Sequence, residues 1–182
     1  MWIILAIVVA IALWLIWTYN GLIRLRNQMQ EAWSDIDVQL KRRHDLIPNL
    51  INTVKGYAAH ESNVLTQVTQ ARASAMSAGN AQEKLAAENM LSQTLKSLFA
   101  VVENYPDLKA NQNFLRLQDE LSDTENKIQA ARRFYNGNVR DFNSQLQSFP
   151  TNVIGSTLHF RAREFFELAG DAEREVPIVQ FS

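Results

Sequence analysis

The sequence predicts an all-α protein in which an N-terminal transmembrane helix continues into an elongated antiparallel bundle of three to four helices. Three observations lead to this prediction. The first 23 residues hold none of the 18 Lys and Arg or 19 Asp and Glu of the 182-residue chain. Beyond them, apolar residues recur every three or four positions, as on one face of an α-helix. No Gly or Pro interrupts residues 22–47, so the first helix can run from the membrane into the body.

Residues 1–23 are expected to form the membrane anchor. Residues 2–17 are all apolar, and the 23 uncharged positions reach about 34 Å as a helix, enough for a hydrocarbon core of about 30 Å. A cleaved signal peptide and a buried soluble helix are the alternatives, but no Lys or Arg precedes the apolar run and the residues that follow it make a poor cleavage site. Amphipathic rings that suit the level of the lipid headgroups are Trp2, Trp14, Trp17 and Tyr19.

The side of the membrane on which the body lies is predicted from the basic residues next to the anchor. Arg24 and Arg26 follow it closely, whereas only the terminal amine precedes it. Because basic residues concentrate on the cytoplasmic side, this asymmetry favours a cytoplasmic body, with a periplasmic body as the alternative.

Residues 24–155 are expected to form the helical bundle. The first body helix either continues past Pro48 with a kink or breaks near residue 47. The small residues 77–80 form a turn, and a helix is expected over 81–104, up to the residues before Pro106. A long helix is expected over 107–148, with a heptad seam that indicates a coiled coil. The seam residues are Phe114, Leu117, Leu121, Thr124, Ile128, Ala131, Tyr135, Asn138 and Phe142.

Residues 156–182 are expected to be irregular or to form a short helix or strand, with residues 176–179 as the strand candidate. This segment contains an aromatic cluster with neighbouring arginines, made up of Phe160, Phe165, Phe166, Arg161 and Arg163. The cluster either folds back over the end of the bundle or forms a patch for a protein or a membrane surface.

The densest polar stretch of the first body helix gives a candidate interaction face. Its residues are Asp37, Lys41, Arg42, Arg43, Asp45, Tyr57 and His60. Arg42 and Arg43 would meet an acidic partner or lipid headgroups. The alternative is a set of structural salt bridges, because Asp37, Lys41 and Asp45 are spaced at four-residue intervals on one helix face.

No catalytic, metal-binding or cofactor-binding constellation is recognised, and we expect the protein not to be an enzyme. His44 and His60 lack the spacing of a helical zinc motif, and the chain has no Cys. The carboxylates Asp119, Glu120, Asp123 and Glu125 fit a solvated helix face. The net charge of −1 argues against nucleic acid as a partner, because binding phosphates requires a basic surface.

Several stretches of the sequence closely resemble the LemA family of bacterial membrane proteins. They are residues 19–20, 32–43, 45–50, 54–57, 60–61 and 71–72 in the first half of the chain, and 103–110, 113–114, 117–118, 121, 124–126, 130–133, 135–136 and 149–150 in the second. After Gly155 the chain departs from the family pattern. The resemblance implies a single-pass protein of the bacterial inner membrane with an antiparallel helical body, and it supplies no catalytic residue.

The sequence and the resemblance together favour a membrane-anchored scaffold or assembly module that forms homo-oligomers, with the lipid bilayer as its first partner. Anchored bundles share one plane, so weak lateral contacts can suffice for assembly. The alternative is an adaptor or regulatory subunit of a membrane protease of the HtpX type, or of an envelope-stress or signalling complex, as the family's associations suggest.

Overall fold

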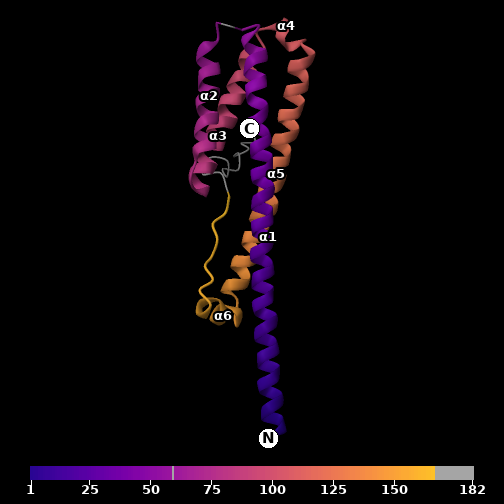
Figure 1. The fold of residues 1–182 in the computed structure, drawn as a ribbon, viewed down its shortest axis with the longest axis vertical. Coiled ribbons are helices and arrows are strands. Elements are labelled where there is room, and N and C mark those ends of the chain that lie inside the picture. The colour runs from indigo at the N-terminus through magenta and orange to yellow at the C-terminus, as the bar shows by residue number, and fades with distance from the viewer. Residues whose placement is uncertain (59, 167–182) are drawn as a thin grey trace, which may run out of the picture. The chain divides into compact units, whose positions relative to one another are not determined.

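A computed structural model describes residues 1–58 and 60–166, and every regular element within these residues is helical (Figure 1). This confirms the all-α prediction. The strand candidate at residues 176–179 lies outside the described residues. The helices are α1 (Trp2–Lys55), α2 (Ser62–Ser77), α3 (Ala81–Val102), α4 (Pro106–Lys109), α5 (Gln112–Gln147) and α6 (Thr151–Thr157).

Helix α1 continues through Pro48, so the expected alternative of a break near residue 47 is wrong. Proline has no backbone N–H, and the carbonyl of His44, four residues earlier, therefore loses its helical donor. The Arg72 side chain of α2 donates its Nε–H to this carbonyl oxygen, with the two atoms 2.7 Å apart. A side chain from a neighbouring helix thus replaces the bond that Pro48 removes.

Short polar segments set the ends of the other helices. The Asn80 side chain accepts a hydrogen bond from the Glu83 backbone N–H at 2.8 Å and caps the start of α3, as expected of an Asn at this position. The helix expected over 107–148 is in fact two helices, α4 and α5. The Asn111 side chain lies between them and accepts bonds from the backbone N–H groups of Asn113 and Phe114, which starts α5 anew.

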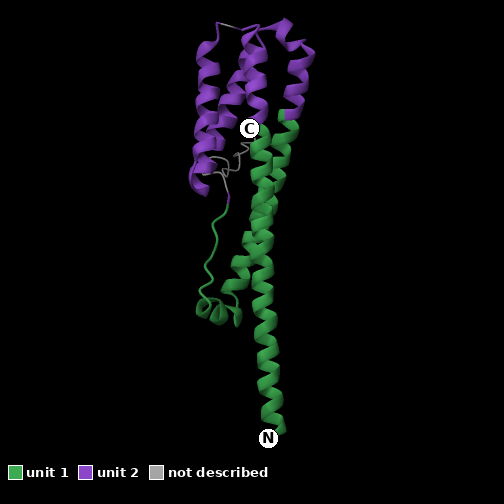
Figure 2. Ribbon diagram, viewed as in Figure 1, with its two compact units in different colours: residues 1–43, 121–165 green, residues 44–120, 166–182 purple. Residues whose placement is uncertain are grey.

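The chain forms two compact units (Figure 2). Unit 1 comprises residues 1–43 and 121–165, and unit 2 comprises residues 44–120 and, among the described residues, Phe166. The long helices α1 and α5 each contribute to both units. The predicted division into an anchor (1–23), a bundle (24–155) and a tail (156–182) rests on polarity and family resemblance rather than contacts, and it stays a prediction.

Unit 1 is built on a pairing of α1 with α5. Its core cluster consists of Leu22, Met29, Val139 and Phe142, with Leu25, Tyr135, Leu146 and Phe160 packed against it. The ring of Phe160 packs edge-on against Tyr19, with the ring centres 6.3 Å apart, and lies at the same distance from Phe142. The C-terminal segment therefore folds back onto unit 1 at Phe160, which was one of the two expectations for the aromatic cluster.

Unit 2 packs α2 and α3 together with the C-terminal part of α1 and the N-terminal part of α5 (Figure 2). Phe99 of α3 meets Phe114 of α5 edge-on, with their ring centres 6.2 Å apart. Its buried apolar residues are Ile47, Leu50, Val54, Ala58, Leu65, Val68, Ala71, Ala75, Leu91, Leu95, Leu98, Val102, Leu108, Phe114 and Phe166. In α1, α2 and α3 these residues follow the three- and four-residue apolar spacing that the sequence shows.

The seam predicted on the long helix is only partly buried. Its buried members are Phe114, Leu121, Thr124, Ile128 and Phe142. The other members, Leu117, Ala131, Tyr135 and Asn138, are half-buried, and Arg132 and Val139 are buried instead between Ile128 and Phe142. A straight α-helix has 3.6 residues per turn, so its buried face drifts away from a strict seven-residue repeat.

Candidate functional site

Residues 2–17 of α1 carry apolar side chains that the rest of the described chain leaves largely uncovered. All of them are exposed except Trp14, which is half-buried. Helix α1 is long and apolar enough to cross a membrane. Of the aromatic residues assigned to the anchor, Trp2 and Trp17 are 85% and 70% exposed, and Tyr19 contacts Phe160.

The predicted interaction face is only partly exposed in unit 1. Lys41 and Arg42 are exposed and Asp37 is half-buried. Arg43, however, is 1% exposed, and its Nη1 lies 2.7 Å from Oε2 of Glu125 on α5. The expectation that Arg43 lies on an open surface is therefore wrong. The reason is its position, because Arg43 continues the buried stripe of Ile36 and Leu40.

Arg42 belongs to an exposed surface shared by α1 and α5. On α5, a hydrogen bond from Lys127 Nζ lowers the pKa of the Asp123 carboxyl, and the charges of Lys127 and Arg42 lower it further. Val38 precedes Arg42 by one helical turn and is 62% exposed. We call Val38, Lys41 and Arg42 the α1 patch: one exposed apolar side chain beside two cations.

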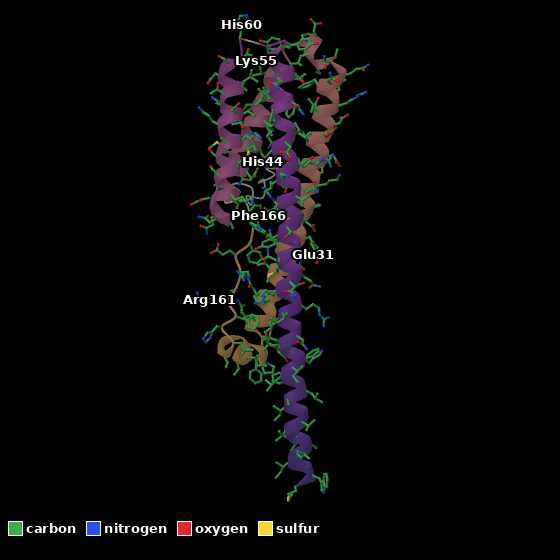
Figure 3. The ribbon with its side chains drawn as sticks, in the orientation of Figure 1. Glu31, His44, Lys55, His60, Arg161 and Phe166 are labelled. Atoms are coloured by element: carbon green, nitrogen blue, oxygen red, sulfur yellow. The ribbon has the colours of Figure 1, made fainter. Side chains whose placement is uncertain are left out.

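The unit 2 members of the predicted face, Asp45, Tyr57 and His60, are all exposed (His60 is labelled in Figure 3). The Tyr57 hydroxyl accepts a hydrogen bond from the Asn111 side chain, with the atoms 2.9 Å apart. The segment after α1 is thereby joined to the segment before α5.

A second bond joins the segment after α1 to the segment between α3 and α4. The Tyr105 hydroxyl donates to Oε1 of Glu61 at 3.0 Å. This hydrogen bond raises the pKa of Tyr105, and burial and the charge of Glu61 raise it further.

The most enclosed polar contact of unit 2 was not found from the sequence. His44 is 7% exposed and Glu88 is fully buried, and the His44 Nε2 lies 2.9 Å from the Glu88 Oε1 (His44 is labelled in Figure 3). The sequence did contain a sign of this contact. Glu88 occupies the position of the apolar stripe of α3 that precedes Leu91, Leu95 and Leu98. A charged residue inside an apolar stripe indicates a buried partner.

The remaining candidate groups are dispersed. Among residues 1–58 and 60–166, no three His, Cys, Asp or Glu side chains come together as a metal site would require. Asp119, Glu120 and Asp123 are exposed on α5, and His159 is exposed after α6. The His44 and Glu88 pair is enclosed, so it is placed to hold helices together rather than to meet a substrate.

Comparison with known proteins identifies the relatives of this chain. The LemA family profile matches residues 32–181. The protein LemA of Metamycoplasma hominis is 30% identical over 156 residues, which cover 85% of this chain and 71% of that protein.

Magnetosome proteins named MamQ are more distant relatives. MamQ 2 of Paramagnetospirillum magneticum is 24% identical, over 88% of this chain and 68% of its own length. MamQ of Magnetospirillum gryphiswaldense is 22% identical, over 86% of this chain and 68% of its own length. The family profile covers far more than half of the sequence, so the chain belongs to the LemA family.

Proposed function

We propose that this protein is a non-enzymatic, membrane-anchored scaffold that assembles laterally with copies of itself in the bacterial inner membrane. The observation that carries the proposal is the unbroken helix α1, which contains both the apolar anchor and the first helix of the body. The LemA family and the relatives named magnetosome proteins support the broader statement that this is a membrane-associated helical protein.

The continuity of α1 fixes the orientation of unit 1 relative to the membrane. Immediately after the apolar run, Leu22 and Met29 are buried against Val139 and Phe142 of α5, so the helix is braced where it leaves the lipid. Gly21, the one glycine at this point, is helical, and Gln145 approaches it from α5. Copies held at the same height and tilt lose less rotational freedom when they meet, which lowers the cost of association.

The α1 patch supplies a suitable contact for this association. Interface centres combine apolar side chains with a polar rim, and Val38 is exposed beside Lys41 and Arg42. Asp123 and Lys127 bring both charge signs to the same surface. A symmetric contact could therefore pair the Arg42 of one copy with the Asp123 of another.

The body is proposed to lie on the cytoplasmic side. Arg24 and Arg26 are exposed immediately after the apolar run, where basic residues favour the cytoplasmic face. A membrane-impermeant maleimide added to spheroplasts should leave a Phe134→Cys variant unlabelled until the cells are opened. Labelling of intact spheroplasts would place the body in the periplasm.

Self-assembly is tested by native mass spectrometry of the full chain extracted with its lipids. We expect oligomers for the unchanged protein and a shift to monomers for Val38→Glu, which places a carboxylate at the centre of the patch. Ser122→Glu adds the same charge at an exposed position of α5 and should leave the oligomers intact. A monomer for the unchanged chain would overturn the proposal.

Crosslinking in native membranes distinguishes the scaffold from the adaptor alternative. Predominant crosslinks between copies of this chain support the scaffold. One abundant partner, such as a membrane protease, with few self-crosslinks would instead support an adaptor or regulatory subunit.

A further inference from the structure

The segment around α6 exposes more apolar surface than its surroundings explain. Between residues 149 and 158, Phe149 is 82% exposed, Val153 57% and Leu158 49%. Each would face water in a body surrounded only by solvent. Three large apolar side chains within one short segment indicate a contact surface.

The segment that exposes these side chains is itself packed against α5. Gly155 of α6 is buried so closely against α5 that a side chain there would meet the Leu146 Cδ1 atom at 2.3 Å. Leu146 in turn packs against the core cluster of unit 1. After α6, Phe160 contacts Tyr19 and Phe142, and the Asn143 side chain bonds both the N–H and the C=O of Arg163.

The length of the anchor places this segment at the membrane boundary. The uncovered apolar residues 2–17 span about 24 Å as a helix, whereas a hydrocarbon core is about 30 Å thick. The missing 6 Å or so corresponds to about four further residues of α1, which are residues 18–21. Tyr19 lies in this stretch and its ring contacts Phe160, so the C-terminal segment packs at the level where the bilayer would end.

The view of unit 1 agrees with this placement, because α6 lies beside the point where the uncovered part of α1 begins (Figure 2). Basic side chains suited to lipid phosphates lie close in the sequence to Tyr19 and to Phe160. Arg24 lines a surface groove of about 330 Å³ together with Trp17, Gly21, Leu25, Gln28 and Gln145. Arg161 and Arg163 are exposed beyond Phe160.

We propose that residues 149–158 form a second membrane contact, which lies along the bilayer surface beside the anchor. Phe149, Val153 and Leu158 enter the boundary between headgroups and acyl chains, where apolar side chains of a surface-lying segment gain most from leaving water. The nearby arginines meet the phosphates. This contact does not depend on self-association, and it would add a second point of support to the single spanning helix.

The experiment uses the absence of cysteine from the natural chain. Single-cysteine variants Phe149→Cys, Val153→Cys and Leu158→Cys of the full chain carry a small fluorophore and are reconstituted in phosphatidylcholine vesicles that contain phosphatidylglycerol. Quenching is measured with lipids that carry a nitroxide near the headgroup or near the chain end, and with iodide in the water. Ile11→Cys is the control within the anchor. Phe134→Cys is the matched aqueous control. Phe134 is also an exposed phenylalanine of unit 1 (58%), and it lies about 20 Å along α5 from the C-terminal end of that helix, at Gln147.

We expect the shallow nitroxide to quench the three positions several-fold more than position 134, and more than the deep nitroxide does. Iodide should quench position 134 several-fold more than the three positions. Quenching at all three positions that matches position 134 would overturn the proposal. Protection from both iodide and lipid would also overturn it, because a second copy would then cover the segment. Circular dichroism of each variant ensures that only folded protein is compared.

Discussion

Two adjacent residues of α1 are buried in different units by different means. Arg43 in unit 1 forms an ion pair with Glu125, whose side chain is 37% exposed. His44 in unit 2 faces the fully buried Glu88, and its carbonyl accepts a bond from Arg72. In unit 1, this turn of α1 is held by an ion pair that water reaches at its Glu125 side. In unit 2, it is held by an enclosed contact to α3 and by a bond from α2.

The difference in exposure between the two contacts determines how much stability is lost when each is removed. A partly exposed ion pair is screened by water, which limits both its gain and the cost of losing it. An enclosed carboxyl is stable only while its surroundings compensate its polarity, so removing one partner is far more costly. We therefore expect substitutions around His44 to affect stability more than those around Arg43.

The largest effect is expected for His44→Leu, which removes the imidazole that faces the buried Glu88. Breaking a buried pair of this kind costs about 3–5 kcal/mol. Guanidinium unfolding of the full chain in micelles, followed by helical circular dichroism, measures the loss. Hydrogen exchange should show lower protection mainly in residues 44–120.

The paired variant His44→Leu with Glu88→Leu tests the reason for this loss. Two apolar side chains of similar size can replace a buried polar pair with little cost, so most of the stability should return. If the double variant is as unstable as His44→Leu alone, the pair is not the source of the loss.

A smaller effect is expected for Arg72→Met, which keeps an apolar stem but removes the donor to the His44 carbonyl. An unsatisfied buried acceptor costs about 1–3 kcal/mol. Pro48→Ala restores a backbone N–H that can reach the same carbonyl, so in this background the cost of Arg72→Met should fall markedly. A double-mutant cycle of unfolding free energies measures the coupling, and additive effects would contradict this role of Arg72.

In unit 1, Glu125→Gln should cost only about 1 kcal/mol, because glutamine keeps an oxygen that can accept the bond from Arg43 Nη1, and water reaches the side chain at position 125. The same guanidinium unfolding measures it, with hydrogen exchange to locate the loss in residues 121–147. A loss as large as that of His44→Leu would mean that the two contacts do not differ in the way their exposure suggests.

Much of the fold followed from the sequence because it depends on local patterns. The apolar run of residues 2–17, the turn at Asn80 and the stripes of α1 and α3 all have direct structural counterparts. The interruption at Asn111 was missed, because the same Asn could continue a helix or cap one, and only the observed side-chain bonds decide.

The site was less predictable because it depends on contacts between distant residues. Arg43 looked like part of a basic surface cluster, yet its place on the buried stripe could have shown otherwise. The contact of Arg72 with the His44 carbonyl joins residues 28 positions apart. Pro48 indicated that a carbonyl would be left free, but nothing in one sequence says which side chain reaches it.

The smallest effects concern two tyrosines whose pKa values are raised for different reasons. In unit 1, burial is the main cause for Tyr135, while in unit 2 the hydrogen bond to Glu61 is the main cause for Tyr105. Each raised pKa contributes stability that is fully present below about pH 10, the unfolded value, and is lost as the pH rises through the folded value. Glu61→Gln should lower the pKa of Tyr105 and leave Tyr135 unchanged, as measured by tyrosinate absorbance with Tyr105→Phe and Tyr135→Phe variants to assign the signals. An equal shift at both tyrosines would mean that a common alkaline opening, and not the local contacts, sets their titration.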